Sequence, residues 1–241
     1  MSNLVLWSLS ELENIDTPYQ KRETFRRVYF DILETYLHSY NIEYLVQGTQ
    51  RHRITGRNAH NNPTREFLAQ DFKVIEPLKD LTKYQIRQIA KRLELPDEIV
   101  NRRPFPGPGL VLRFGGTYNP EKLKKIRMAT HIVDNYVNAE KDIFSPCYQI
   151  FPYLVDGSPV VYKPRGEEGG LGNLILIRSV RFPQEIDDGK KYSIFLSPLE
   201  KQEELVYRLM EMVGIARVCW DMTTKLEVTN GQKSCGAIEY I

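Results

Sequence analysis

The chain has few of the residues that build disulfide-bonded or metal-bound domains. Its 241 residues include three cysteines, Cys147, Cys219 and Cys235, and none of them forms a C-x-x-C pair. An odd number of widely spaced cysteines predicts reduced thiols rather than a disulfide framework or a zinc site. Only four histidines are present, and no two share a helix face at ligand spacing. We therefore expect no metal site built from these residues.

Long apolar runs and an excess of one charge are also missing. The longest apolar runs, such as residues 174–177, have the length of a strand, and the first four residues contain no basic side chain. This pattern predicts neither a membrane span nor a signal peptide, and a cytoplasmic location is expected. Lys and Arg total 33 against 31 Asp and Glu, a net charge of +2. Such a balance gives no global field that would attract nucleic acid or a membrane surface.

Helix and strand patterns alternate in the first half of the chain. Thr17 and Pro18 begin a helix predicted to run to about residue 40, with apolar residues at helical spacing. Residues 42–46 and 73–76 have the pattern of short strands, and Thr82 is expected to cap another helix. This order is typical of an α/β domain, in which functional loops follow the carboxy ends of the strands.

Residues 51–65 differ from the rest of this half because they are basic and rich in turn-forming residues. Four arginines, Arg51, Arg53, Arg57 and Arg65, appear without an acidic residue, and glycine, asparagine and proline predict a loop. A solvated or phosphate-facing loop is the favoured interpretation. RNA binding is an alternative, which the lack of aromatic residues for base stacking disfavours.

The second half is predicted to be an α+β domain. A helix is expected from Asn119 to about residue 139 and another over about residues 200–213. Strands are expected near residues 148–155, 160–163, 174–180, 192–195 and 216–220. Helices on a mostly antiparallel sheet make this half α+β.

The two halves meet at a proline- and glycine-rich run, Arg102-Arg103-Pro104-Phe105-Pro106-Gly107-Pro108-Gly109, called the Pro/Gly run below. Its prolines fix φ, while Gly107 and Gly109 let a ligand approach the backbone closely. An adjacent arginine offers planar donors suited to a phosphate, so the run predicts a rigid cradle for a nucleotide monophosphate. A stiff interdomain linker with solvated arginines is the alternative interpretation.

These motifs resemble the GMP synthase family. Gln47-Gly48-Thr49, then residues 75–81, then the Pro/Gly run occur in that family's order, and Ile238-Glu239-Tyr240 resembles its tail. The resemblance implies that residues 1–110 are a truncated ATP-pyrophosphatase domain, a Rossmann-like adenine nucleotide alpha-hydrolase fold. Residues 111–241 would be the α+β dimerisation domain.

The resemblance also implies an activity and its residues. The family adenylates xanthosine monophosphate (XMP) with Mg-ATP, and ammonia from a glutamine amidotransferase then yields GMP. Lys83 matches the catalytic lysine placed against the departing pyrophosphate, where a fixed cation stabilises developing charge. Without the resemblance, Lys83 is a solvated lysine in the first turn of a helix. The remaining candidates are, for the substrate, Arg102, Gly107, Gly109, Gln149, Lys225, Lys233, Ile238 and Glu239, and, for ATP, Gln47, Gly48, Thr49 and His60.

Some of these assignments stay open. Lys225 and Lys233 are both candidates for the lysine of a lid that closes over the base with Glu239, and an exposed tail is the alternative. Gln149 is either a nucleotide-binding amide or an amide at the edge of the core.

The chain also departs from the family, because it contains no Ser-Gly-Gly-Val-Asp-Ser loop of the kind that wraps the ATP pyrophosphate. The ATP and Mg²⁺ that the family uses are therefore not expected to be bound by this chain alone. We expect a homodimer, with separate ATP-pyrophosphatase and glutamine amidotransferase chains as possible partners. Residues 1–110 are expected to need a partner or a self-associated dimer for stability. A non-catalytic protein that binds a purine nucleotide and dimerises is the main alternative.

Overall fold

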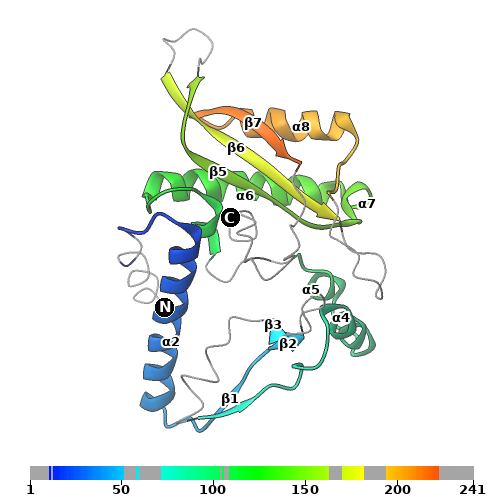
Figure 1. Cartoon of the computed structure of the whole chain (residues 1–241). Helices are drawn as coiled ribbons and strands as arrows, with labels where there is room; N and C mark the ends of the chain where they lie inside the picture. The colour runs from blue at the N-terminus through cyan, green and yellow to red at the C-terminus, as the bar shows by residue number, and fades with distance from the viewer. Residues whose placement is uncertain are drawn as a thin grey trace, which may run out of the picture. The chain divides into compact units, whose positions relative to one another are not determined.

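The computed structural model describes residues 11, 13–51, 58–59, 72–103, 105, 109–162, 170–181 and 194–222. The chain is mixed α/β and forms two compact units, Phe25–Arg103 and Met1–Thr24 together with Pro104–Ile241. Figure 1 shows the elements of both. The domain boundary at residue 110 stays a prediction. None of the helices within the described ranges is both long and apolar enough to cross a bilayer.

The unit Phe25–Arg103 contains most of helix α2 (Pro18–Ser39) and two short parallel strands, β1 (Tyr44–Val46) and β4 (Lys73–Ile75). Helices α4 (Lys83–Arg92) and α5 (Asp97–Val100) follow. The expected caps are confirmed: Thr17 Oγ1 accepts from the Gln20 N–H at 3.2 Å, and Thr82 forms a capping box with Gln85. These helices begin where the sequence predicted because capping is decided by residues three apart.

A small ladder corrects the prediction of a loop over residues 51–65. Strand β2 (Gln50–Arg51) pairs antiparallel with β3 (Asn58–Ala59). Two residues on each side are too few to show an alternating apolar pattern, so the sequence carried no strand signal here. The rest of this basic segment, including His60, lies outside the described residues.

The same unit buries little apolar surface among its described residues. Its core cluster consists of Leu37 and Phe72, with Phe30, Leu33 and Leu45 partly buried against it. Two apolar side chains at the carboxy ends of the parallel strands remain in solvent, since Val46 is 66% and Ile75 46% exposed. An isolated two-stranded sheet is marginally stable at best, so we expect this unit to be the less stable of the two.

The other unit is a three-stranded sheet with helices. Its elements are η1 (Gly109–Arg113), α6 (Pro120–Ala139), α7 (Lys141–Phe144), β5 (Cys147–Tyr162), β6 (Gly170–Arg181), α8 (Leu199–Met210) and β7 (Ile215–Asp221). The strand order is β5-β6-β7, with β5–β6 antiparallel and β6–β7 parallel. The start of α2 belongs to this unit because buried Lys21 donates from Nζ to the Phe114 carbonyl at 2.9 Å.

Two strand predictions in this unit need correction. The strands expected at residues 148–155 and 160–163 are one strand, β5, whose register with β6 shifts between Val155 and Val160. The strand expected at residues 192–195 is a single bridge between Ile194 and Val180 within the described residues. A register shift lets a strand continue through a break in the alternation, so the gap in the pattern did not mark a turn.

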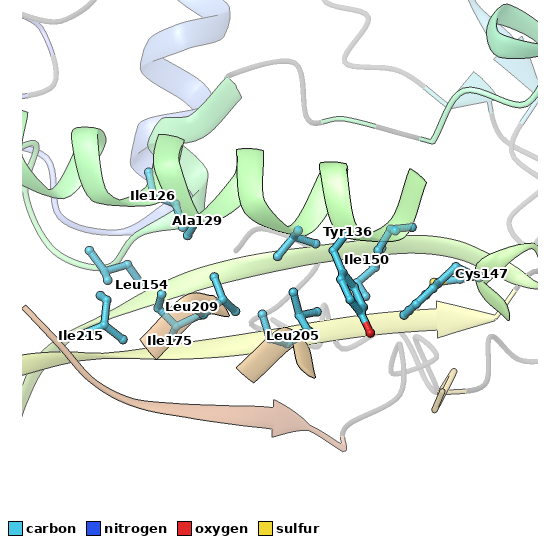
Figure 2. Packing of buried hydrophobic residues seen from close by; sticks show 14 of the residues in the cluster. Ile126, Ala129, Tyr136, Cys147, Ile150, Leu154, Ile175, Leu205, Leu209 and Ile215 are labelled. Atoms are coloured by element: carbon cyan, nitrogen blue, oxygen red, sulfur yellow. The ribbon is translucent and has the colours of Figure 1, made fainter. Parts of the chain in front are cut away.

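The core of this unit lies between the sheet and the two long helices (Figure 2). On α6 the buried positions follow helical spacing, and on β5 they alternate, as Ile150 and Leu154 show. The cluster consists of Val111, Phe114, Ile126, Ala129, Val133, Tyr136, Val137, Phe144, Cys147, Ile150, Leu154, Ile175, Ile177, Phe195, Leu205, Leu209 and Ile215. This single cluster joins α6, α8 and all three strands.

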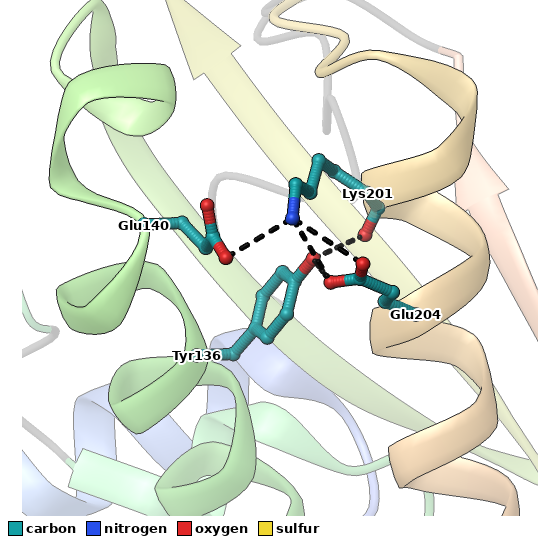
Figure 3. Close-up of polar contacts among 4 residues, drawn as sticks. All are labelled: Tyr136, Glu140, Lys201 and Glu204. Carbon is teal, nitrogen blue, oxygen red and sulfur yellow. Dashed lines mark hydrogen bonds and ion pairs between the residues drawn. The ribbon is translucent and has the colours of Figure 1, made fainter.

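A polar network fastens α6 to α8 beside this core (Figure 3). The buried Tyr136 hydroxyl donates its one proton to Glu204 Oε2 at 2.8 Å, and the Lys201 carbonyl oxygen is a second acceptor 3.0 Å away. Lys201 Nζ in turn lies 3.1 Å from Glu140 Oε1 and 3.2 Å from Glu204 Oε2. Burial and the hydrogen bond to Glu204 raise the pKa of Tyr136, while the hydrogen bonds from Tyr136 and Lys201 lower the pKa of Glu204.

Tyr136→Phe tests the hydroxyl of this network. We expect the free energy of unfolding to fall by about 1–2 kcal/mol, because the ring still fills the core but a hydrogen bond to a carboxylate is lost. Urea denaturation measures the change. Tyr207→Phe is the matched control, since Tyr207 lies on the same helix, α8, and is 72% exposed; an equal loss in both variants would contradict the role of the network.

The lowered pKa of Glu204 predicts a dependence on acid pH. The carboxylate form is favoured in the folded state, so its contribution is present above the unfolded pKa of 4.5 and is lost as the pH falls through the folded value. Wild type and Glu204→Gln should therefore differ in urea midpoint at neutral pH and converge once the solution is acidic enough to protonate the folded-state carboxyl. A constant difference across this range would show that the carboxylate charge is not what stabilises the contact.

Candidate functional site

The carboxy ends of β1 and β4 lie at one edge of their small sheet. The strands run parallel with Val46 opposite Ile75, and the Gln47 N–H donates to the Ile75 carbonyl at 2.9 Å. Beyond this bond, the buried Thr49 hydroxyl donates to Glu76 Oε1 at 2.6 Å. The two motifs that the sequence singled out in this half are thus joined side by side, at the edge where open α/β sheets bind ligands.

Three cations follow this edge. After the turn at residues 77–80, α4 begins at Lys83, and Arg87 lies one turn further along the same helix. Arg87 Nη2 donates to the Arg102 carbonyl at 2.9 Å, which ties α4 to the start of the Pro/Gly run. Tertiary structure therefore brings together the predicted catalytic lysine and the predicted phosphate-binding arginine, with Arg87 between them. We call Lys83, Arg87 and Arg102 the cation cluster.

The electrostatics of the cation cluster favour an anion. Partial burial, followed by the like charges of Arg87 and Arg102, lowers the pKa of Lys83. The capping box at the start of α4 occupies the N–H groups of Thr82 and Gln85, so two of the donors at this helix terminus are already used. A phosphate or pyrophosphate group would relieve the repulsion among the three charges and accept their hydrogen bonds.

Two further predicted residues lie in the other unit. Gly109 begins η1 with φ of +74°, and a side chain built on it would meet nothing within 4 Å. Glycine is required there by the backbone conformation, and the space beside it is open. Gln149 is half-buried on β5, opposite Val180 on β6.

Of the remaining predicted residues, only Gly48 is described. It follows β1, and no atom lies within 4 Å of where its Cβ would be. The others lie outside the described residues: His60, Gly107, Lys225, Lys233, Ile238 and Glu239. Their roles stay predictions.

Sequence reasoning missed two basic residues that the structure singles out, Arg87 and Arg113. Arg87 lies four residues after Lys83, the spacing that places side chains on one helix face, so its position carried a usable signal. Arg113 lies four residues beyond the last glycine of the Pro/Gly run, and its burial gave no signal in the sequence. Charged residues are rarely buried, so no pattern rule would have selected it.

Comparison with known proteins decides the family. No family model matches the chain. A curated protein from Pyrococcus furiosus, named as a subunit of glutamine-hydrolyzing GMP synthase, is 32% identical over 226 residues, covering 90% of this chain and 68% of the relative. Proteins of the same name from Methanopyrus kandleri and Methanosarcina barkeri are 32% and 33% identical, covering 90% and 92% of this chain and 70% and 71% of their own length. The chain belongs to this family of GMP synthase subunits.

Membership confirms the resemblance drawn from the motifs and gives the chain a GMP synthase-like role in GMP biosynthesis. The relatives' name marks each of them as one subunit, which implies a separate partner subunit. The cation cluster therefore belongs to a chain whose relatives are named as subunits of GMP synthase.

Arg87→Met tests the electrostatics of the cation cluster. We expect the pKa of Lys83 to rise only part of the way to 10.5, because burial is a larger cause of its lowering than either arginine. Titration followed by NMR of a ¹³C label at the lysine Cε measures it. Arg92→Met, an exposed change in the last turn of the same helix, should leave the titration unchanged; an equal shift in both variants would contradict a local cause.

Proposed function

We propose that this GMP synthase family member binds XMP and presents it for ATP-dependent amination to GMP. The observation that carries the proposal is the cation cluster, Lys83, Arg87 and Arg102, which follows the carboxy end of a parallel strand in a chain of this family. Phosphate groups occur on both XMP and ATP, and clustered cations suit them.

The proposed roles follow the chemistry of each group. Lys83 stabilises the charge that develops on the departing pyrophosphate, and Arg102 binds the 5′-phosphate of XMP together with the backbone of Gly107 and Gly109. Gln149 contacts the same nucleotide through its amide. The lid would contain Ile238, Glu239 and one of Lys225 and Lys233, and it would exclude water from the adenylated intermediate.

ATP would be contacted by Gln47, Gly48, Thr49 and His60, and groups elsewhere would complete its binding site. Among the residues that the structure describes, no three His, Cys, Asp or Glu side chains gather in a way that could hold a metal ion. The described residues therefore offer no preformed metal site of this kind, and we propose that groups outside them help to hold Mg²⁺. The pyrophosphate-wrapping loop and the ammonia supply are proposed to come from other segments or chains.

The exposed apolar residues of the unit Phe25–Arg103 support the need for such a partner. Val46 and Ile75 end two parallel strands and are 66% and 46% exposed, and exposed apolar surface on a small sheet is a site for further packing. We propose that additional strands of the ATP-pyrophosphatase fold cover this surface. Homodimerisation is proposed to use the unit that contains the three-stranded sheet.

Thermal stabilisation by nucleotides tests the proposal. The melting temperature of the protein should rise with XMP and with GMP at millimolar concentration, and much less with AMP or ATP, because the chain is proposed to hold the XMP side of the reaction. Stabilisation by ATP alone would overturn the assignment.

Lys83→Met should retain XMP-dependent stabilisation but abolish pyrophosphate release in the presence of the partner chain.

A pyrophosphate-release assay with the partner chain separates the proposal from its main alternative, a non-catalytic nucleotide-binding protein. Adding a chain that carries the ATP loop should produce pyrophosphate only when XMP is present. Binding of XMP without turnover, with every partner tried, would instead identify a non-catalytic nucleotide-binding protein.

A further inference from the structure

Within the described residues, Arg113 is a buried cation that lacks the hydrogen-bond partners such a group normally has. It ends η1 and is only 2% exposed. Across the described part of the chain, its Nε and Nη1 atoms are buried and have no hydrogen-bond partner. Burial lowers the pKa of Arg113 to about 9, and Asp134, an exposed residue of α6, opposes this only in part. Unsatisfied donors on a buried charge are unfavourable, so this arrangement favours the binding of an anion.

Two aromatic rings hold the guanidinium. Its Cζ lies 3.3 Å from the centre of the Phe151 ring and 5.5 Å from that of Phe105. Phe151 belongs to β5 and Phe105 to the Pro/Gly run. A guanidinium stacked on a ring donates in its own plane, which fixes the direction of the N–H groups and suits a planar, two-point contact with a phosphate.

The location of Phe151 relates Arg113 to the predicted nucleotide site. Ile150 and Leu154 point into the core below α6, so Phe151 and Gln149 lie on the opposite face of β5. These two residues are two positions apart on one face, about 6.6 Å along the strand. Arg113 thus stacks on a ring that is two positions from the predicted nucleotide-binding amide on the same strand face, and it lies four residues after Gly109, where the backbone adjoins open space.

We propose that Arg113 is a phosphate-binding residue of the XMP site, donating its Nε–H and Nη1–H groups to the nucleotide's 5′-phosphate. The inference rests on the proposed function and adds to it a residue that neither the motifs nor the family name identifies. Phe151 and Phe105 hold the guanidinium in place. Because its Nε and Nη1 atoms are buried, the groups that cover them have to move aside for the phosphate to reach them. Because burying this charge is costly until the nucleotide binds, the residue favours binding at the expense of stability.

The test is calorimetric binding of XMP and of xanthosine, which lacks the phosphate, to the full chain. Arg113→Met should weaken XMP binding about 10- to 100-fold, the loss expected for hydrogen bonds to a charged group, and leave xanthosine binding unchanged. The XMP affinity of Arg113→Lys should lie between those of wild type and Arg113→Met, because lysine keeps the charge but not the two-point geometry. The melting temperature of Arg113→Met without nucleotide should equal or exceed that of wild type.

Arg208→Met is the matched control, since Arg208 Cζ also lies over a ring, 5.2 Å from the centre of Tyr136, but on α8. It should bind XMP like wild type. The proposal would be overturned by wild-type XMP affinity in both Arg113 variants, or by equal losses for XMP and xanthosine. If the wild-type protein itself does not bind XMP, the proposed function fails as a whole; if it does, unchanged binding in the Arg113 variants rejects this inference alone.

Discussion

The apolar contact between α6 and the β5–β6 ribbon is the constraint on which the larger unit depends. Residues such as Ile126 and Val133 face Leu154 and Ile175, and every one of these four side chains is essentially buried. A helix repeats every 3.6 residues and a strand every two, so only one face of each element can supply this contact. Truncating one such side chain typically costs about 2–5 kcal/mol. The position of η1, and of Arg113 at its end, follows from this packing because Val111 and Phe114 on either side of it belong to the same core.

The sites proposed for this chain depend on local charge, since the total charge is nearly balanced at +2. In one unit the cation cluster combines Lys83, Arg87 and Arg102; in the other, buried Arg113 stacks on Phe151, with the Phe105 ring 5.5 Å away. Both arrangements are unfavourable for the protein alone, the first through like-charge repulsion and the second through desolvation. Both become favourable when an anion is bound, which is the physical reason to associate them with a nucleotide. Membership in a family of GMP synthase subunits names the chemistry that such anions would serve.

The parts of the fold that were predicted correctly are those decided by neighbours in sequence. The capping box of Thr82 and Gln85, the Asn119 cap and Pro120 at the start of α6, and the apolar spacing of α6 involve residues within one or two turns. Strand pairing was predicted less well. The single long strand β5, the small β2–β3 ladder and the parallel pairing of β7 with β6 depend on partners chosen from elsewhere in the chain. The motifs located Lys83, Arg102 and Gln149 as candidates, but not the residues that surround them.

By itself, the sequence determined the bounds of the long helices, the α/β character and the family, because caps, periodicity and motif order can all be read along the chain. Tertiary structure alone decided which charges meet. The bond from Thr49 to Glu76 joins residues 27 apart, and the bond from Arg87 to Arg102 joins residues 15 apart. Arg113 meets Phe151 only because η1 packs on the sheet. Side-chain burial and charge contacts between distant segments depend on how the whole core closes, and no local pattern records that outcome.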